Sequence, residues 1–187
     1  MNLRYSIPLL ILPLLIPNVY GEASIVSLVE AIRVVDGDTI IVKGMEGFRA
    51  GDEFRVRLAD INAPEMDTPE GRIAKDRLTD MLRGKYLVLD IDTKYIYDRY
   101  GRVVAVVYTV DGSNDGMYTL ININMLLVEE GYATYRDYDN SFNPSSWSLR
   151  IECNDDAPIR CIPEVHVPIL VLTILASMSI LIRRVIR

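Results

Sequence analysis

The sequence is poor in the residues that many hydrolases use as nucleophiles or proton carriers. Its 187 residues include one histidine, His166, and two cysteines, Cys153 and Cys161. No serine or cysteine nucleophile has a histidine partner around it, and no glycine-rich phosphate loop precedes an expected helix. These absences argue against hydrolases that form a covalent intermediate and against nucleoside triphosphatases.

Positive charge is also scarce. The chain has 20 Lys and Arg residues against 26 Asp and Glu residues. Four of the arginines lie in the terminal segments, so residues 21–164 carry 16 basic and 26 acidic residues, a net charge of −10. A protein that holds nucleic acid by bulk charge is basic. If this chain acts on nucleic acid, a bound cation and a local arginine cluster must attract it.

The N-terminal residues 1–23 have the layout of a secretory signal peptide. They hold Arg4, then an apolar run over residues 7–16 interrupted by prolines, then a short polar stretch. A retained N-terminal anchor is the alternative, but the run is shorter than the roughly 18 residues that a membrane span needs. We therefore expect cleavage near residue 23.

A second apolar run, over residues 165–182, is followed at once by three arginines of the last five residues. We expect a transmembrane helix here and a cytoplasmic tail at 183–187, because a basic cluster after a span marks the cytoplasmic side. A buried helix is the alternative, but it would usually carry a polar stripe. This predicts a single-pass protein of the cell membrane, with a lipid partner, an extracellular domain and His166 at the interface.

The two cysteines lie in residues 141–164, which we expect to form a loop-rich extracellular stalk. In an exported protein, Cys153 and Cys161 predict a disulfide that closes a small loop. Two free thiols are the alternative. A metal site is not indicated, because two cysteines and the distant His166 do not make a ligand set.

Residues 24–140 predict one α+β, mainly β, domain. A helix should begin at the N-cap Thr68 and end at Gly84, and Asn122 or Asn124 should cap a second helix that stops at Gly131. Five strands with a helix between the third and fourth are typical of an OB-type Greek-key barrel, here with two or three packed helices. The expected strands are residues 25–35, 39–43, 54–58, 86–91 and 103–110.

Three motifs concentrate charged residues: VVDGDT (34–39), RVRLADINAPE (55–65) and DRYGR (98–102). Each alone is explained as a turn or a strand exit. Together they offer what phosphodiester hydrolysis needs: oxygen ligands for a hard cation, a carboxylate to position water, and guanidinium groups for the phosphoryl charge.

Specific residues fit these roles. Calcium accepts carboxylate, amide and backbone oxygens, so the side chains of Asp38 and Asn62 and a carbonyl near Ala63 are candidate ligands. Arginine stays charged and holds phosphate oxygens in a fork, which suits Arg57 and Arg102.

With NMLLVEEGYA (124–133) following in the same order, residues 25–138 resemble the staphylococcal nuclease family. The resemblance implies an OB barrel and calcium-dependent cleavage of DNA and RNA that leaves 3′-phosphate ends. By the matching positions, Asp38 would bind calcium directly and Glu65 would act on the attacking water. Arg57 and Arg102 would stabilise the pentacoordinate phosphate. The catalytic domain would be extracellular, and no obligate protein partner is indicated.

The chain departs from the family at Asn62, where an aspartate usually binds calcium. We expect weaker calcium binding, unless Asp60 or Asp36 supplies compensating charge. Strict strand alternation from Arg57 would also point Asn62 to the opposite face, so a break must lie between them. The resemblance implies that break, whereas the spacing does not show it.

Several further residues have two readings. Tyr100, Tyr135 and Tyr138 are candidates to stack on or bond to a nucleotide, or they face solvent from a strand. Arg99 contacts phosphate or is a solvated charge, and the hydroxyl of Thr39 supports the aspartate turn or belongs to an ordinary strand residue. A non-catalytic, surface-displayed OB-type binding module is the alternative function, favoured by Asn62 and by the acidic balance.

Overall fold

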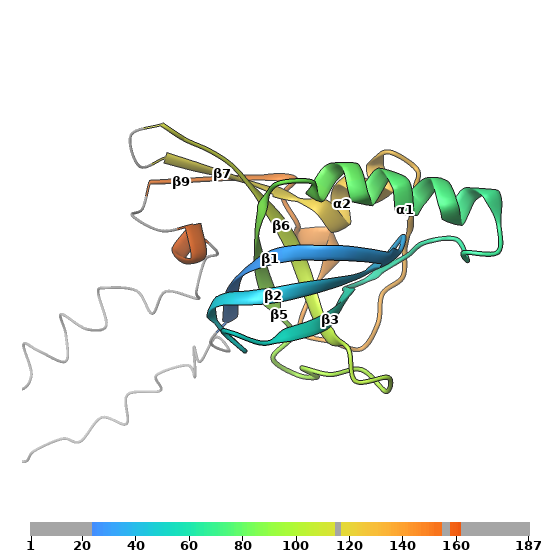
Figure 1. Cartoon of the computed structure of the whole chain (residues 1–187), viewed down its shortest axis with the longest axis horizontal. Coiled ribbons are helices and arrows are strands. Elements are labelled where there is room, and N and C mark those ends of the chain that lie inside the picture. The colour runs from blue at the N-terminus through green and yellow to red at the C-terminus, as the bar shows by residue number, and fades with distance from the viewer. Residues whose placement is uncertain (1–23, 115–116, 155–157, 162–187) are drawn as a thin grey trace, which may run out of the picture. The chain divides into compact units, whose positions relative to one another are not determined.

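The computed structural model describes residues 24–114, 117–154 and 158–161 (Figure 1). The expected signal peptide (1–23), transmembrane helix (165–182) and tail (183–187) lie outside these residues. Within the described part of the chain, no helix is long and apolar enough to cross a membrane.

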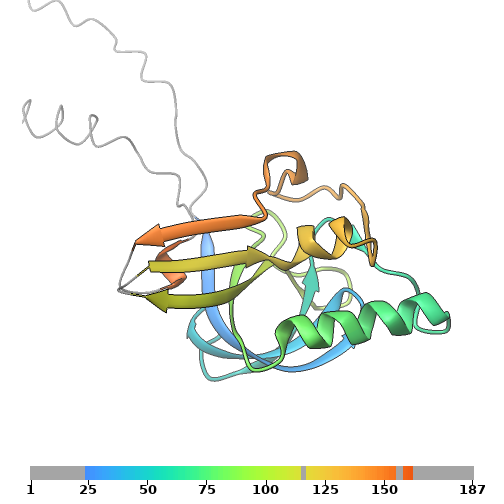
Figure 2. The same cartoon turned by 90° about the horizontal axis from the view of Figure 1, so that it is seen from above.

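Five strands close a barrel, as expected. Neighbouring strands follow the order β3-β2-β1-β5-β6, and a short parallel pairing between β3 and β6 joins the two ends. The closed ring is visible from above in Figure 2. Its strands are β1 (Ile25–Asp36), β2 (Thr39–Gly47), β3 (Glu53–Leu58), β5 (Tyr86–Ile91) and β6 (Val103–Asn114).

The two expected helices are confirmed. Helix α1 (Pro69–Leu82) begins where the hydroxyl of Thr68 accepts a hydrogen bond from the backbone N–H of Gly71 at 3.0 Å. Helix α2 (Ile123–Glu129) begins where the side chain of Asn122 accepts from the N–H of Met125 at 3.0 Å. Asn122 is therefore the cap, and Asn124 has a different role.

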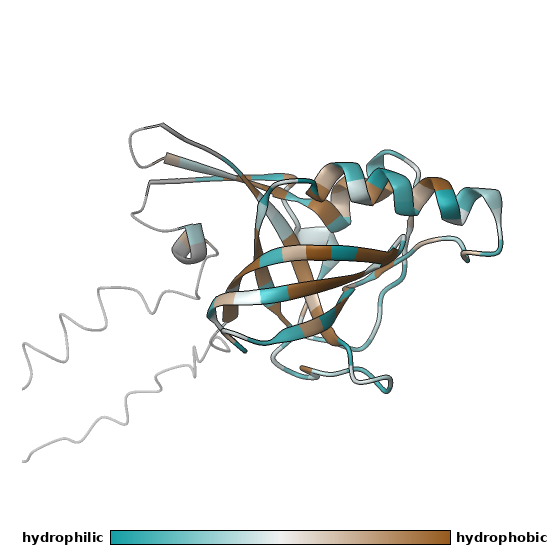
Figure 3. Ribbon diagram, in the orientation of Figure 1, coloured by the Kyte–Doolittle hydropathy of each residue, from teal (hydrophilic) through white to brown (hydrophobic). Residues whose placement is uncertain are grey.

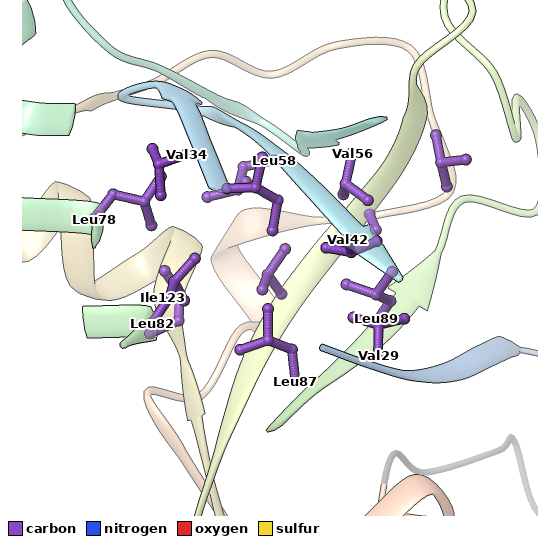
Figure 4. Close-up of a cluster of buried hydrophobic side chains, with 14 of the residues drawn as sticks. Val29, Val34, Val42, Val56, Leu58, Leu78, Leu82, Leu87, Leu89 and Ile123 are labelled. Carbon is purple, nitrogen blue, oxygen red and sulfur yellow. The ribbon is translucent and has the colours of Figure 1, made fainter. Parts of the chain in front are cut away.

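The barrel interior and the buried side of α1 share one hydrophobic core. Alternate residues of the strands point inward, so their apolar side chains fill the ring, and Leu78 and Leu82 of α1 cover one end (Figure 4). Hydrophobic positions are concentrated in these strands (Figure 3). Burial of this core, at about 25 cal/mol per Å² of apolar surface, is the main stabilising contribution to the fold.

The sheet continues beyond the barrel, a feature that the sequence did not predict. Strand β7 (Met117–Asn122) pairs with β6, and β9 (Arg150–Asn154) pairs with β7. Two-residue strands β4 (Ile61–Asn62) and β8 (Thr134–Tyr135) pair separately. The remaining elements are the 3₁₀ turns η1 (Pro144–Ser146) and η2 (Pro158–Cys161).

Residues 141–154 and 158–161 thus differ from the loop-rich stalk that we expected. Strand β9 adds an edge to the main sheet, and Trp147 packs against the hydrophobic clusters. The five-residue strand is too short to show a period, and its partner β7 is far away in sequence, so only the tertiary pairing reveals it. Cys161 is buried and disulfide-bonded. The sequence has one other cysteine, Cys153, and we propose that it is the partner of Cys161.

Candidate functional site

A cleft of about 730 Å³ brings the three charged motifs together. The β1–β2 turn, the β3–β4 turn, the segment leading into β6 and residues 138–140 all contribute to its walls. Of the residues singled out in the sequence, those lining the cleft are Asp36, Asp38, Arg57, Asp60, Asn62, Ala63, Glu65, Arg99, Tyr100, Arg102 and Tyr138.

Asp38 is fixed at the floor of this cleft. Its side chain is nearly buried, the hydroxyl of Thr39 donates to its Oδ1 at 3.1 Å, and the N–H of Ala63 donates to its Oδ2 at 3.0 Å. Burial raises the pKa of Asp38, although the positive charge of Arg57 and these hydrogen bonds act in the opposite direction. The carboxylate therefore sits in a site that favours a nearby cation.

The turn before Asp38 requires a glycine. A Cβ on Gly37 would lie 2.5 Å from Cβ of Ala63 and 2.9 Å from Cβ of Ala74 on α1. The carboxylate of Asp36 accepts from the N–H of Asp38 at 3.0 Å, which closes the turn. This close approach presses the Asp38 backbone against the segment that carries Asn62 and Ala63.

Arg57 projects from the end of β3 beside Asp38. Its Nη2 lies 3.2 Å from Oδ2 of Asp38, and the guanidinium donates to the carbonyl oxygens of Leu58 at 2.6 Å and Ile61 at 2.8 Å. The side-chain oxygen of Asn62 also accepts from Nη2 at 3.4 Å. These four contacts fix the orientation of the planar guanidinium group.

The contact between Arg57 and Asn62 confirms that the strand alternation is interrupted. Strand β3 ends at Leu58 and β4 begins at Ile61, and Asp60 between them has a left-handed backbone with φ of 51°. This turn brings Asn62 to the same side as Arg57.

Glu65 lines the cleft from the segment that precedes α1. Its carbonyl accepts from the hydroxyl of Thr68 at 2.7 Å, and a Cβ on Gly71 would lie 2.0 Å from that oxygen. The start of α1 thus holds the Glu65 backbone. Its exposed carboxylate has no hydrogen-bond partner among residues 24–114, 117–154 and 158–161, so it can accept bonds from water.

Arg102 is oriented by Asp98. Nε and Nη2 of Arg102 both lie 2.7 Å from Oδ2 of Asp98, while Oδ1 accepts from the N–H groups of Tyr100 at 2.8 Å and Arg102 at 2.9 Å. Partial burial acts to raise the pKa of Asp98, but the hydrogen bonds from Arg102 and Tyr100 outweigh it and lower that pKa. Asp98 therefore stays charged and holds the guanidinium in place.

Thr39 joins the two halves of the site. Its hydroxyl donates to Oδ1 of Asp38 and accepts from Nη1 of Arg102 at 3.1 Å. Of the two readings of this threonine, the structure favours the supporting role. Asp38, Arg57 and Arg102 thus form one connected network.

Two buried aspartates that were not predicted to have a structural role, Asp60 and Asp92, also line the cleft. Asp60 accepts from the N–H of Tyr138 at 3.0 Å and from the side chain of Asn140 at 2.6 Å. Asp92 accepts from the N–H of Ser141 at 3.0 Å and from its hydroxyl at 2.8 Å. Both are fully buried, so the loop over residues 136–141 is anchored at two points. Burial raises the pKa of Asp60.

The tyrosines separate into two groups. Tyr100 and Tyr138 line the cleft, and Tyr100 is 65% exposed, with Cζ of Arg99 at 4.7 Å and Cζ of Arg102 at 5.3 Å from its ring centroid. Tyr135 is not among the cleft residues: it pairs with Ile61 in the β4–β8 sheet, and its ring lies 6.1 Å from that of Trp147. Two cleft tyrosines that we did not single out are Tyr95 and Tyr97.

The oxygen donors in the cleft are of the kinds that a hard cation such as calcium accepts. In the described part of the chain no three His, Cys, Asp or Glu side chains are grouped as a metal site, so Asn62 and backbone oxygens would have to complete the shell. A carboxylate has about four lone-pair sites, and Asp38 uses three. The cleft presents three guanidinium groups against seven carboxylates, namely those of Asp36, Asp38, Asp60, Glu65, Asp92, Asp98 and Asp139.

Comparison with known proteins gives a consistent result. The chain is 40% identical over 110 residues to the micrococcal nuclease of Shigella flexneri, covering 58% of this chain and 59% of that protein. It is 32% identical over 142 residues to an uncharacterized endonuclease of Escherichia coli, covering 73% and 77%. An uncharacterized endonuclease of Haemophilus influenzae is 34% identical over 112 residues, covering 58% and 53%.

A family description, "Staphylococcal nuclease homologue", matches residues 55–152. This match contains Arg57, Glu65 and Arg102, and it extends through most of β9, which supports placing that strand in the domain rather than in a stalk. Asp38 precedes the matched residues, but its contacts with Ala63 and Arg57 join it to them. The chain belongs to the staphylococcal nuclease family.

Proposed function

We propose that this chain is a nuclease that hydrolyses phosphodiester bonds of DNA, RNA or both with the help of calcium and leaves 3′-phosphate ends. The observation that carries the proposal is the network in which Thr39 joins Asp38 to Arg102 while Asp38 also contacts Arg57. Two oriented guanidinium groups and a carboxylate thus converge on one open cleft.

Arg57, Arg102 and Glu65 have different roles in the proposed reaction. Arg57 and Arg102 bind the non-bridging oxygens of the scissile phosphate and stabilise the charge that builds up on them. Glu65 orients a water molecule and takes its proton as the water attacks phosphorus. The bond from phosphorus to the 5′-oxygen breaks, the leaving oxygen gains a proton from solvent, and the 3′-oxygen keeps the phosphate.

Calcium would be held by Asp38, Asn62 and the carbonyl of Ala63. When bound, it neutralises phosphate charge and polarises water. Support for a cation comes from the cleft itself, because an excess of carboxylates over guanidinium groups repels a polyanion unless positive charge is added. Tyr100, Tyr138 and Arg99 line the cleft and would contact the nucleotide, whereas Tyr135 is not among the cleft residues.

The proposal includes the location expected from the sequence: export by residues 1–23 and anchoring in the cell membrane by residues 165–182, with the catalytic domain extracellular. Proteolysis of intact cells tests this location. Loss of the full-length protein, with a cytoplasmic marker protein intact, is expected. Survival of the protein in intact cells and its digestion only after lysis would contradict an extracellular domain.

Activity is tested with the purified full-length chain in detergent. Single-stranded DNA and RNA are incubated with calcium, with magnesium and with a chelator, and the ends of the products are identified. We expect calcium-dependent cleavage that is lost in Glu65→Gln and Arg102→Ala and retained in Arg83→Ala, an exposed arginine after α1.

A surface-displayed binding module is the second candidate, favoured by Asn62 in place of an acid and by the acidic cleft. Oligonucleotide binding without cleavage under any metal would support it. Cleavage that depends on Glu65 would exclude it.

A further inference from the structure

Tyr95 and Tyr97 lie in the cleft but have no part in the chemistry proposed above. They belong to the segment between β5 and β6, and they are 51% and 48% exposed. Ile96 between them packs against the core, and its carbonyl accepts from the N–H of Val104 at 3.0 Å. The inward side chain of Ile96 therefore anchors a segment whose two neighbouring aromatic rings remain accessible.

The ring of Tyr97 is supported from one side. It lies 6.4 Å from the ring of Phe48, between centroids, and Phe48 in turn packs edge-on against Phe54 at 6.1 Å. Phe54 is almost fully buried in the core. A chain of three rings thus runs from the barrel interior to the cleft, so Tyr97 is held as a rigid surface.

Tyr95 has a different neighbour. The ammonium of Lys94 lies 5.4 Å from the centroid of its ring and forms an ion pair with Asp139. The positive charge of Lys94 is therefore already matched by a carboxylate. What Tyr95 offers a ligand is mainly the surface of its ring.

The charge balance of the cleft determines which ligand suits these rings. In the proposed function Arg57 and Arg102 hold the scissile phosphate, and seven carboxylates line the same cleft. Beyond that phosphate, little positive charge remains to hold the rest of a strand. Stacking on aromatic rings needs no charge and accepts any base.

We infer that Tyr95 and Tyr97 form a second nucleobase-binding subsite, the aromatic platform, which stacks unpaired bases that flank the scissile nucleotide. The inference rests on the proposed function, since it assumes that a strand enters the cleft. It implies that the platform binds substrates long enough to reach it and contributes little to the smallest ones. It also implies that binding to the platform depends weakly on salt, because few phosphate contacts are involved.

Binding is measured first, in calcium, with the full-length chain carrying Glu65→Gln so that the strand is not cut. The probe is a fluorescently labelled dodecathymidylate, followed by anisotropy. Adding Tyr95→Ala and Tyr97→Ala together should weaken binding by roughly tenfold or more, the effect of losing stacked bases. Phenylalanine at both positions should restore most of the affinity, because the ring remains.

Tyr86→Ala is the matched control, since Tyr86 on β5 is 57% exposed and does not line the cleft. It should bind as tightly as the parent. Equal affinity of the parent and the double alanine variant would overturn the platform, and so would equal losses in the alanine and phenylalanine variants.

Cleavage is measured next with the unmutated Glu65. With the dodecanucleotide, the double alanine variant should show a KM raised by roughly tenfold and an unchanged kcat. With a dinucleotide, which is too short to reach the platform, it should cleave as fast as the parent. If the parent cleaves DNA or RNA but the tyrosine substitutions change neither binding nor KM, the aromatic platform is wrong and the proposed nuclease activity stands. If no cleavage is seen but binding depends on the two tyrosines, the proposed nuclease activity is wrong and the platform stands.

Discussion

The side-chain nitrogen of Asn124 on α2 lies 2.9 Å from the carbonyl oxygen of Ala59, in the turn that follows Arg57. The other end of the same amide accepts from the N–H of Val107 on β6 at 3.0 Å. One buried side chain thus links the turn after Arg57 to the strand that follows Arg102.

Replacing Asn124 by alanine should destabilise the protein by about 2 to 3 kcal/mol, because it leaves a buried donor and a buried acceptor without partners. Denaturant unfolding monitored by circular dichroism measures the change. Asn143→Ala, which removes an exposed cap from η1, is the control and should cost about 1 kcal/mol or less. A similar cost for both variants would contradict the bridging role.

Gly37→Ala should lower both stability and activity, because the new methyl group overlaps Ala63 and Ala74. We expect a loss of about 1 to 3 kcal/mol, typical of overpacking. Adding Ala63→Gly removes the nearer of the two clashes, so thermal stability should recover in part. No recovery in the double variant would mean that the turn conformation, rather than the overlap, requires glycine.

Asp60 should tolerate asparagine far better than alanine. Asparagine keeps an oxygen for the N–H of Tyr138 and accepts the left-handed backbone, whereas alanine loses the bonds and is strained at φ of 51°. We expect Asp60→Ala to destabilise by about 2 kcal/mol or more and to increase hydrogen exchange at residues 136–141. Unchanged exchange there in Asp60→Ala would argue against the anchor.

Asp90 gives a pH-dependent test of stability. Burial raises its pKa from 3.8 to about 6, so the folded state binds the proton more tightly than the unfolded state. Its contribution to stability is therefore complete below about pH 4 and is lost as the pH rises to about 6. Asp90→Asn should stabilise the protein by about 3 kcal/mol at pH 7 and hardly at all at pH 3.8.

The measurement is urea unfolding of both proteins across this pH range, with the exposed Asp76→Asn on α1 as the control. A gain from Asp90→Asn that is equal at both pH values would show that charge is not its cause.

Asn62→Asp should tighten calcium binding, by about tenfold or more, since it adds one negative charge next to Asp38 and Arg57. Isothermal titration calorimetry with the full-length chain measures the affinity, and adding a chelator should reverse the binding. Lower affinity in the variant would show that the amide is the preferred ligand at this position.

The sequence was sufficient for the elements with strong local signals. The barrel strands repeat apolar residues with a period of two, and Thr68 and Asn122 are helix caps with local bonding patterns. Strands β4, β7, β8 and β9 were missed. Strands β4, β8 and β9 are short, and each exists only through pairing with a partner far along the chain.

The candidate site was only partly visible in the same way. Spacing and motif order identified Asp38, Arg57 and Arg102, but Thr39 as the bridge between them depends on the barrel bringing β2 beside the start of β6. Asn124 was considered only as a helix cap and Asp60 only as a compensating charge, and Asp92 was not singled out, because the partners of all three lie far away in sequence. What distinguishes these three residues is that their polar side chains are fully buried. Burial is a property of the folded chain and cannot be read from the sequence.

The parallel pairing of β3 with β6 is the seam that closes the barrel. Arg57 lies on the β3 side of this seam, opposite Val104. Arg102 lies on the β6 side, immediately before Val103. Every other pairing in the ring is antiparallel and can form while the seam is open. An open ring would keep the two guanidinium groups apart. The proposed phosphate site therefore exists only in the closed barrel, and a change that opens this seam would remove the site without altering either arginine.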